Sequence, residues 1–322
     1  KKRIAGKIVS NGAEDRLRKA IIDNPNILNT TQSMTFAVDD DVDSFLRGFI
    51  SRDTPESERR INNQMIAYIE DLKIQGRISY RLSDYLIFGS ASRNAEMAGI
   101  KGAFIGSLFT LSICFMIAFP LGISTAIYLE EIAPKNRITE LIEININNLA
   151  AVPSVVFGIL GLAVFISIFG MPRSIPLIGG VVLALMTIPT IIISSRAAIR
   201  AVPPSIRDAA LAVGASKVQT IFHHVVPLAM PGMLTGTIIG MAQALGETAP
   251  LLMIGMVAFI VDVPGSVSDP GTVLPVQIFM WADFAERMFV QKTSAAIIVL
   301  IAFLVIMNAS AVWIRNKIER RW

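Results

Sequence analysis

The sequence predicts an all-α protein that crosses a membrane several times. Two observations about composition support this: 53% of the 322 residues are apolar, and the mean hydropathy is +0.58. The third is that apolar runs of roughly 20 residues recur, which is the length a helix needs to span a hydrocarbon core. The runs with this character are Gly102–Tyr128, Asn147–Phe169, Leu177–Ile193, Gly232–Ile260 and Thr293–Ile314. We therefore expect five visible transmembrane helices.

Basic residues are unevenly distributed among the segments that flank these runs. Those after the first, third and fifth runs are Lys135, Arg137, Arg196, Arg200, Arg207, Lys217, Arg315, Lys317, Arg320 and Arg321. The two opposite connections carry only Arg173, Arg287 and Lys292. Because cytoplasmic loops are enriched in Lys and Arg, we expect the C-terminus to be cytoplasmic and residues 1–100 to lie outside.

Residues 1–100 are polar, and we interpret them as a small extracytoplasmic segment. Within Glu58–Lys73, apolar residues recur at helical spacing. They are Ile61, Met65, Ile66 and Ile69. The acidic run Asp39–Asp43 lacks the full spacing of a calcium loop, so we interpret it as a solvated turn. Because the chain begins at Lys1 and the visible runs are odd in number, we expect a preceding signal or transmembrane helix to be missing.

The sequence shows no pattern typical of a metal site or a disulfide. The sole cysteine, Cys114, lies in the first apolar run, and no cluster of Cys and His has metal-ligand spacing. The sequence also lacks a P-loop, because Gly6-Lys7 has neither the upstream Gly nor the following Ser or Thr. We expect no metal ligands, no nucleic-acid partner and no ATP hydrolysis by this chain.

Prolines interrupt the second and third runs, at Pro153 and Pro189. Each removes a backbone hydrogen bond and predicts a kink, which membrane helices commonly tolerate. The fourth run contains small residues at every fourth position, a ridge that lets two helices approach closely. They are Gly232, Gly236, Gly240 and Ala244. The pattern leaves open whether the neighbouring helix belongs to this chain or to a partner.

An ionisable residue, Glu247, follows this ridge, four residues after Gln243. A carboxylate inside a membrane costs at least about 2.5 kcal/mol unless it is paired or hydrated. One interpretation is that Glu247 faces a polar cavity or a cation. The alternative is that the helix breaks at Gly246 and Pro250 and Glu247 is a structural acceptor near an interface.

The polar segment 203–227 predicts a helix-turn-helix elbow in the cytoplasm. Ser205 and Asp208 have capping-box spacing and predict a first helix through Val213. Gly214 suits a left-handed C-cap position, because glycine adopts it without strain.

A second capping-box pattern, Ser216 and Gln219, predicts a second helix that ends at His224, before Pro227. Ala209 and Ala210 give the first helix a smooth surface that can lie in a groove. His223 and His224 point about 100° apart on a helix, so we expect an interfacial role and not a shared ion.

This elbow resembles the EAA loop of ABC-importer permeases, E-A-A-x3-G-x9-I-x-L-P. Asp208-Ala209-Ala210, Gly214 and Pro227 are in register, whereas Asp208 replaces Glu, His224 replaces Ile and Val226 replaces Leu. Further segments resemble phosphate-importer permeases of the PstA type. They are Tyr128–Glu131, Ala151–Ser154, Gly246–Leu252 and Leu274–Phe279. The family often has Arg where this chain has Gln243, which can donate hydrogen bonds but supplies no charge.

The resemblance implies a MetI-like permease core at 101–318 and a loop at 203–227 that docks into an ATPase subunit. The residues implied in docking are Ser205, Asp208, Ala209, Ala210, Gly214, Lys217 and Pro227. Those implied in the substrate path are Gln243, Glu247 and Thr248. The implied partners are a second related permease, an ATPase dimer that binds ATP and magnesium, an extracytoplasmic phosphate-binding protein, inorganic phosphate and the bacterial cytoplasmic membrane.

Two alternatives remain open at this point. The chain could be a permease for another oxyanion, sulfate or molybdate, because the EAA loop is common to such importers. It could also be a scaffold that reports phosphate status to a sensor kinase without carrying flux.

Overall fold

The structure is a computed structural model that describes residues 6–10, 12–28, 30–31, 33–81, 84–257 and 259–318. Its regular elements are helices, and within the described residues the β structure is one isolated bridge, Val9 to Val38. The prediction of an all-α protein is confirmed. The chain divides into two compact units, which are described separately below.

The first unit contains the described part of Lys1–Gly102 together with Val261–Val263 and Met280–Ala296. It therefore extends beyond the expected segment 1–100. Its helices are α2 (Ala13–Asp23), α3 (Asp40–Leu46), α4 (Asn63–Ile74) and α5 (Asp84–Phe88), with short 3-10 turns at Pro25–Ile27, Glu56–Glu58 and Ala95–Met97. The first part of α15 (Arg287–Ile318) completes it.

The helical spacing in residues 58–73 marks the core of this unit. All four apolar residues of that pattern are buried. The helix begins at Asn63, because the Asn62 side chain accepts a hydrogen bond from the Met65 N–H at 2.8 Å and caps it. The expected solvated turn at Asp39–Asp43 is wrong: Asp39 caps α3, and acidic residues fill the first turn, where the helix dipole favours them.

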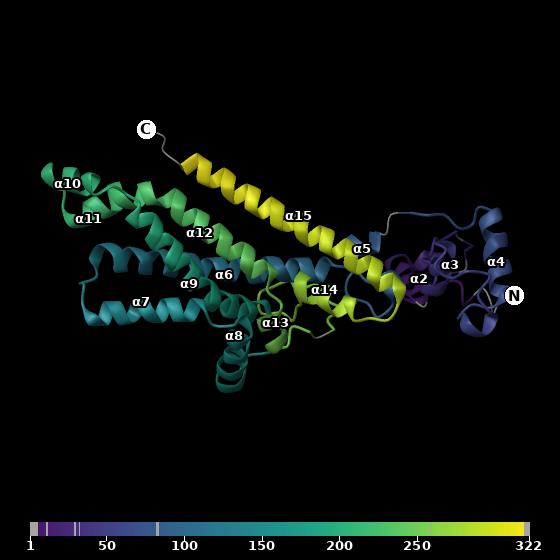
Figure 1. The fold of residues 1–322 in the computed structure, drawn as a ribbon. Coiled ribbons are helices and arrows are strands. Elements are labelled where there is room, and N and C mark those ends of the chain that lie inside the picture. The colour runs from purple at the N-terminus through teal and green to yellow at the C-terminus, as the bar shows by residue number, and fades with distance from the viewer. Residues whose placement is uncertain are drawn as a thin grey trace. The chain divides into compact units, whose positions relative to one another are not determined.

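The second unit contains the membrane helices. Its elements are α6 (Lys101–Ile127), the π-helical turn η4 (Tyr128–Ile132), α7 (Arg137–Ala150), α8 (Ser154–Gly161), η5 (Leu162–Ile168), α9 (Pro176–Arg200), α10 (Pro204–Ala212), α11 (Lys217–Thr220), η6 (Ile221–Val225), α12 (Val226–Gly246), α13 (Ala249–Met253), α14 (Leu274–Ala282) and the remainder of α15. Figure 1 shows α9 and α12 side by side, and these two helices form the main contact of the unit.

Four helices among the described residues are long and apolar enough to cross a membrane, and a bent pair brings the number up to five. The four are Lys101–Ile132, Pro176–Arg200, Lys217–Gly246 and Arg287–Lys317. Four expected boundaries are therefore wrong by six residues or more: the end of the third run, both ends of the fourth and the start of the fifth. In particular, Arg196 and Arg200 belong to the third span, and Lys292 belongs to the last.

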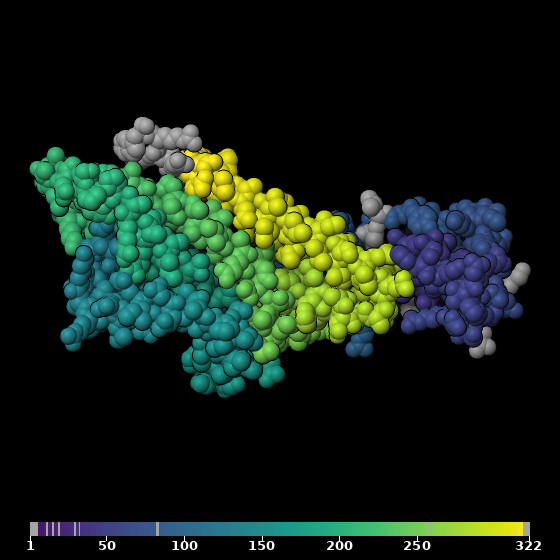
Figure 2. Space-filling view, viewed as in Figure 1, coloured from purple at the N-terminus to yellow at the C-terminus, as the bar shows by residue number. Residues whose placement is uncertain are grey.

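The second expected span, Asn147–Phe169, is not one continuous helix. The chain bends by 98° between α7 and α8–η5. Pro153 lies at the bend and is the N-cap of α8; it lacks an N–H and disfavours helical geometry in the residue before it. Pro189, in contrast, lies inside α9, which continues through it. In Figure 2 the α8–η5 segment stands out from the surface of the second unit.

The spans differ in how much of their surface is covered. In the most apolar window of Pro176–Arg200, 56% is buried, against 6% in Arg287–Lys317. α9 is thus the central helix of the second unit. The exposed apolar surface of α15 is suited to lipid contact, because lipid tails are as apolar as its side chains.

Candidate functional site

The elbow, residues 203–227, consists of α10, a turn at Gly214 and α11, which continues through η6 into α12. Gly214 has φ +93°, the left-handed conformation that favours glycine. Its N–H donates to the Leu211 carbonyl, and the Ala215 N–H donates to the Ala210 carbonyl, both at 3.0 Å. This pair of bonds is a Schellman motif, which ends α10 and turns the chain. Figure 2 shows the elbow (green) at the surface of its unit.

The two expected capping boxes have different outcomes. The Ser216 box is confirmed: Ser216 N–H donates to Gln219 Oε1 at 2.8 Å, and Gln219 N–H donates to Ser216 Oγ at 3.3 Å. The Ser205–Asp208 box is wrong, because α10 begins at Pro204 and its N-cap, Pro203, makes no side-chain cap. Pro204 has the φ that a first helical residue needs, so the helix starts before Ser205.

The expected end of the second helix before Pro227 is also wrong. α11, η6 and α12 form one continuous helix over Lys217–Gly246, and Pro227 lies inside it. The π-helical turn Ile221–Val225 directly precedes this proline. A π-helical turn is one way in which a membrane helix compensates for the backbone hydrogen bond that proline removes. The elbow is consequently the extension of a membrane span and not a separate loop.

The residues predicted for the elbow differ in exposure. Ser205, Asp208, Ala209, Gly214 and Lys217 are exposed, Pro227 is partly buried and Ala210 is buried. His223 and His224 are also exposed on η6.

The sequence analysis missed a set of apolar side chains on the same elbow. They are Leu211, Val213, Val218 and Phe222, of which Val213 is 85% exposed. Exposed apolar side chains on a segment that projects from the membrane helices are typical of a docking surface.

The ridge of small residues on α12 packs against α9 of the same chain. A Cβ atom on Gly232 would lie 2.6 Å from Ala198 Cβ, and one on Gly240 would lie 2.9 Å from Thr187 Cγ2. At Gly236 it would collide with the Ser194 hydroxyl. Ala244 is 1% exposed. Replacing any of these glycines would push α9 and α12 apart.

At its other end, α12 stops at Gly246. Glu247 has extended geometry, with φ −76° and ψ 125°, and Thr248 is the N-cap of the short helix α13. The expected continuation of this span to Ile260 is therefore wrong, and the alternative of a helix break is the observed structure. Gln243 is exposed, and Glu247 and Thr248 are partly buried. Their polar groups thus lie at a surface where the membrane helix is interrupted.

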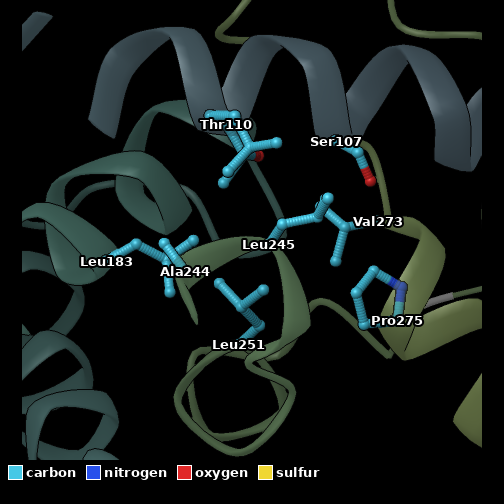
Figure 3. Close-up of a pocket in the computed structure, with 9 residues that line it drawn as sticks. Ser107, Thr110, Leu183, Ala244, Leu245, Leu251, Val273 and Pro275 are labelled. Carbon is cyan, nitrogen blue, oxygen red and sulfur yellow. The ribbon is translucent and has the colours of Figure 1, made fainter. Parts of the chain in front are cut away.

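A small cavity lies beside this break. Figure 3 shows side chains from α6, α9, α12 and α13 converging on it with Val273 and Pro275. Its polar groups are few: the Ser107 hydroxyl accepts the Leu274 N–H at 2.8 Å, and the Thr110 hydroxyl is buried without a hydrogen-bond partner in the described chain. The lining is too apolar to bind an anion, so the cavity is a packing feature of the break.

Charged side chains lie where α6, α7, α9 and α10 meet; the sequence analysis used the arginines only for sidedness and predicted no ion pairs among them. Arg196 Nε is 2.5 Å from Glu130 Oε1, and Arg196 Nη2 is 2.7 Å from Glu143 Oε2. Arg200 Nη2 is 2.8 Å from the same Glu130 oxygen. The sequence feature that could have indicated this cluster is the acidic pair Glu130-Glu131, which lies on the side of the membrane where the loops are otherwise basic.

No group of three His, Cys, Asp or Glu side chains that could hold a metal ion occurs in the described part of the chain. Cys114 is buried in α6. Arg320 and Arg321, which contributed to the expected sidedness, lie outside the described residues.

Several apolar spans, together with a helical elbow that exposes apolar side chains, define a polytopic helical membrane protein. The family model for the binding-protein-dependent transport system inner membrane component matches residues 118–322, and the chain belongs to that family. A second model, for a domain of unknown function (DUF3333), matches residues 1–56.

Several curated relatives match half to two thirds of the chain. The phosphate transport system permease protein PstC of Haemophilus influenzae is 30% identical over 65% of this chain and 73% of its own length. The phosphate transport system permease protein PstA 1 of Mycobacterium tuberculosis is 28% identical over 69% of this chain and 72% of its own. The probable ABC transporter permease protein YqgI of Bacillus subtilis is 34% identical over 53% of this chain, which spans 58% of that protein.

The fold is also found among solved structures. An inward-facing structure of the MetNI methionine ABC transporter matches 67% of this chain and 95% of the compared chain, with a TM-score of 0.55 and 16% identity. The MetI-like fold expected from the resemblance is therefore confirmed.

Proposed function

We propose that this chain is a transmembrane permease subunit of an ATP-driven importer of inorganic phosphate. The observation that carries the proposal is the continuous helix Lys217–Gly246, which joins the exposed elbow to the span packed along α9. A displacement of the elbow by a partner would move this span as a rigid lever. Such a lever can switch access between the two sides of a membrane.

The partners follow from the family and from the elbow. A binding-protein-dependent component requires a substrate-binding protein outside and an ATPase inside. The apolar surface around Val213 and Val218 suits a groove in the ATPase, together with Asp208 and Ala209 on the first helix of the elbow. ATP and magnesium would bind to the ATPase and not to this chain. In this arrangement the elbow and the C-terminus are cytoplasmic, and residues 1–100 are outside.

A second, related permease completes the proposed complex. Relatives named PstC and PstA both occur in Haemophilus influenzae, and both are similar to this chain. The path between two such subunits would include the polar surface of Gln243, Glu247 and Thr248. Because Gln243 contributes no charge, any cation facing the anion there would come from the second permease.

The substrate assignment rests on the names of the relatives, which specify phosphate and favour it over sulfate or molybdate. The test is ATP-dependent uptake of labelled phosphate in proteoliposomes that contain this chain, its related permease and the ATPase, with binding protein outside. We expect uptake that excess sulfate does not suppress. Absence of uptake from an assembled complex, or uptake suppressed by sulfate, would contradict the assignment.

The scaffold alternative predicts a different result in the same assay. If the chain only reported phosphate status, disrupting Gly214 or Asp208 would leave uptake unchanged. Loss of uptake in an assembled Gly214 variant would exclude that alternative.

A further inference from the structure

The elbow is attached to the membrane helices at a second point besides α12, through Arg207 on α10. Its guanidinium donates to Glu131 Oε1 from Nη2 at 2.6 Å and from Nε at 3.1 Å. The same group donates to the Val202 carbonyl at 2.7 Å and to the Ile199 carbonyl at 3.0 Å. Glu131 lies at the end of the α6 span, Ile199 in the last turn of α9, and Val202 in the connection from α9 to α10. One side chain therefore joins three elements.

The acceptors explain why arginine suits this position. The last carbonyls of a helix lack the usual partner four residues ahead, and Arg207 donates to one of them, Ile199, and to the Val202 carbonyl just after α9. Its planar group presents donors in a fixed fork, so it can hold the carbonyls and Glu131 at once. Lysine, with a compact charge, cannot reproduce this pattern.

The neighbouring cluster extends the connection deeper into the unit. Arg196, whose side chain is 9% exposed, joins Glu130 on η4 to Glu143 on α7. Arg200 shares Glu130, whose side chain is 12% exposed. Together the six groups carry three formal positive and three formal negative charges. They are Glu130, Glu131, Glu143, Arg196, Arg200 and Arg207.

Such a neutral cluster resists partial opening. Separating Arg196 from Glu130, or Arg207 from Glu131, leaves a charge unpaired at low exposure, which is costly. The Arg200 side chain is 62% exposed, so its pair with Glu130 contributes little. Moving all six groups together preserves every pair. Apolar contacts slide past one another more easily because they have no fixed direction. The cluster therefore favours movement of α10 with the ends of α6 and α9 as one body.

We infer that Arg207 and Glu131, supported by the Arg196–Glu130–Arg200 ion pairs, transmit displacement of the elbow to α6 and α9. This inference rests on the proposed function, in which an ATPase displaces the elbow. Arg207 and Glu131 are positioning residues, since they contact neither substrate nor nucleotide. The elbow thus drives the membrane helices through two connections: the continuous helix into α12 and the ion-paired root of α10.

The first test measures whether the elbow and the α6 end move as one body. Spin labels are placed at Ala212 and Lys135, both exposed, after Cys114 is replaced by Ser. In the assembled complex we expect one narrow distance distribution that is the same without nucleotide and with trapped ATP. Arg207→Met should broaden the distribution or make it depend on nucleotide.

The second test measures the phosphate imported per ATP hydrolysed. In Arg207→Met we expect ATP hydrolysis to persist while this ratio falls roughly 5-fold or more, the lower range for a lost coupling between two sites. Arg137→Met is the matched control, because Arg137 is an exposed arginine without an ion pair among the described residues. If Arg207→Met does not assemble, Glu131→Gln removes the charge and keeps an acceptor, and both measurements are repeated on it.

The outcomes separate the inference from the proposed function. An unchanged distance distribution together with an unchanged ratio in Arg207→Met would overturn the inference. So would equal losses of ATP hydrolysis and uptake with an unchanged distribution, since they would mean only fewer active complexes. The distance measurement needs ATP but no phosphate, so a wild-type complex that imports no phosphate would refute the proposed substrate alone.

Discussion

The two ends of the Lys217–Gly246 helix are built in contrasting ways although both lie near a proline. At the elbow end, Pro227 is inside the helix, which continues through the π turn Ile221–Val225. At the other end, Pro250 lies in the first turn of α13, and the chain leaves helical geometry at Glu247. Proline alone therefore does not decide whether a membrane helix is interrupted. The comparison indicates a continuous helical connection toward the elbow and an interrupted one beside the polar residues.

We expect the largest loss of uptake from a substitution in the elbow, Gly214→Pro. Proline cannot adopt a φ of +93° and would lose the N–H that donates to Leu211, so we expect a local cost of about 3 kcal/mol or more. Phosphate uptake should be abolished while membrane insertion remains normal. Gly214→Ala is the control, because it keeps the N–H and should retain part of the uptake. Wild-type uptake by an inserted Gly214→Pro variant would refute the coupling role of the elbow.

The next largest effect is expected at the broken end, from Glu247→Ala. If Glu247 lines the path or pairs with a partner cation, flux should fall roughly 10-fold or more, because a hydrogen bond to a charged group contributes about 1.5–3 kcal/mol. Uptake is measured at equal amounts of assembled complex. Glu247→Gln, which keeps the shape, should also lose flux if charge matters. A Glu247→Ala complex that fails to assemble would favour a structural role.

Softening the elbow end should give a smaller effect. Replacing His223 and His224 by Gly increases the backbone freedom of the π turn. Each Gly should destabilise the turn by about 1 kcal/mol relative to Ala. We expect uptake to fall several-fold with little loss of ATP hydrolysis. The double Ala variant is the control and should remain near wild type. Equal losses in both variants would mean that the imidazoles themselves matter, and not the stiffness of the turn.

The smallest effect separates the two serines of the elbow. Ser216→Ala removes an observed capping box and should destabilise the start of α11 by about 1 kcal/mol. Ser205→Ala should have almost no effect, because Ser205 makes no cap in the structure. Hydrogen exchange of the Lys217–Thr220 amides is the measurement. Faster exchange in Ser205→Ala than in Ser216→Ala would contradict the assigned helix start.

The membrane fold and the elbow were predictable because both depend on local sequence. Hydropathy identifies spans, and Gly214 and the Ser216 box have direct signatures in short motifs. A kink was expected at both Pro153 and Pro189, but the sequence did not show that the chain bends by 98° at Pro153 while α9 continues through Pro189. What differs is the packing around each proline, which a sequence pattern does not contain.

The ion-paired cluster was missed for a related reason. Arg196 and Arg200 were counted as loop charges because the third span was expected to end at Ile193, whereas α9 continues to Arg200. Glu130 and Arg196 are far apart in the chain, and only the packing of η4 against α9 brings them together. Charge pairs of this kind become visible when helix ends are known to within one turn.

The close approach of α9 and α12 restricts which substitutions the two helices can accept during evolution. Each of the three ridge glycines on α12 faces α9, Gly232 at Ala198, Gly236 at Ser194 and Gly240 at Thr187. A larger side chain at one position on α12 requires a smaller residue at the facing position on α9. Among homologous sequences we therefore expect the two members of each pair to vary together, with their summed size nearly constant. The exposed face of α15 has no such partner, so its residues should vary freely among apolar types.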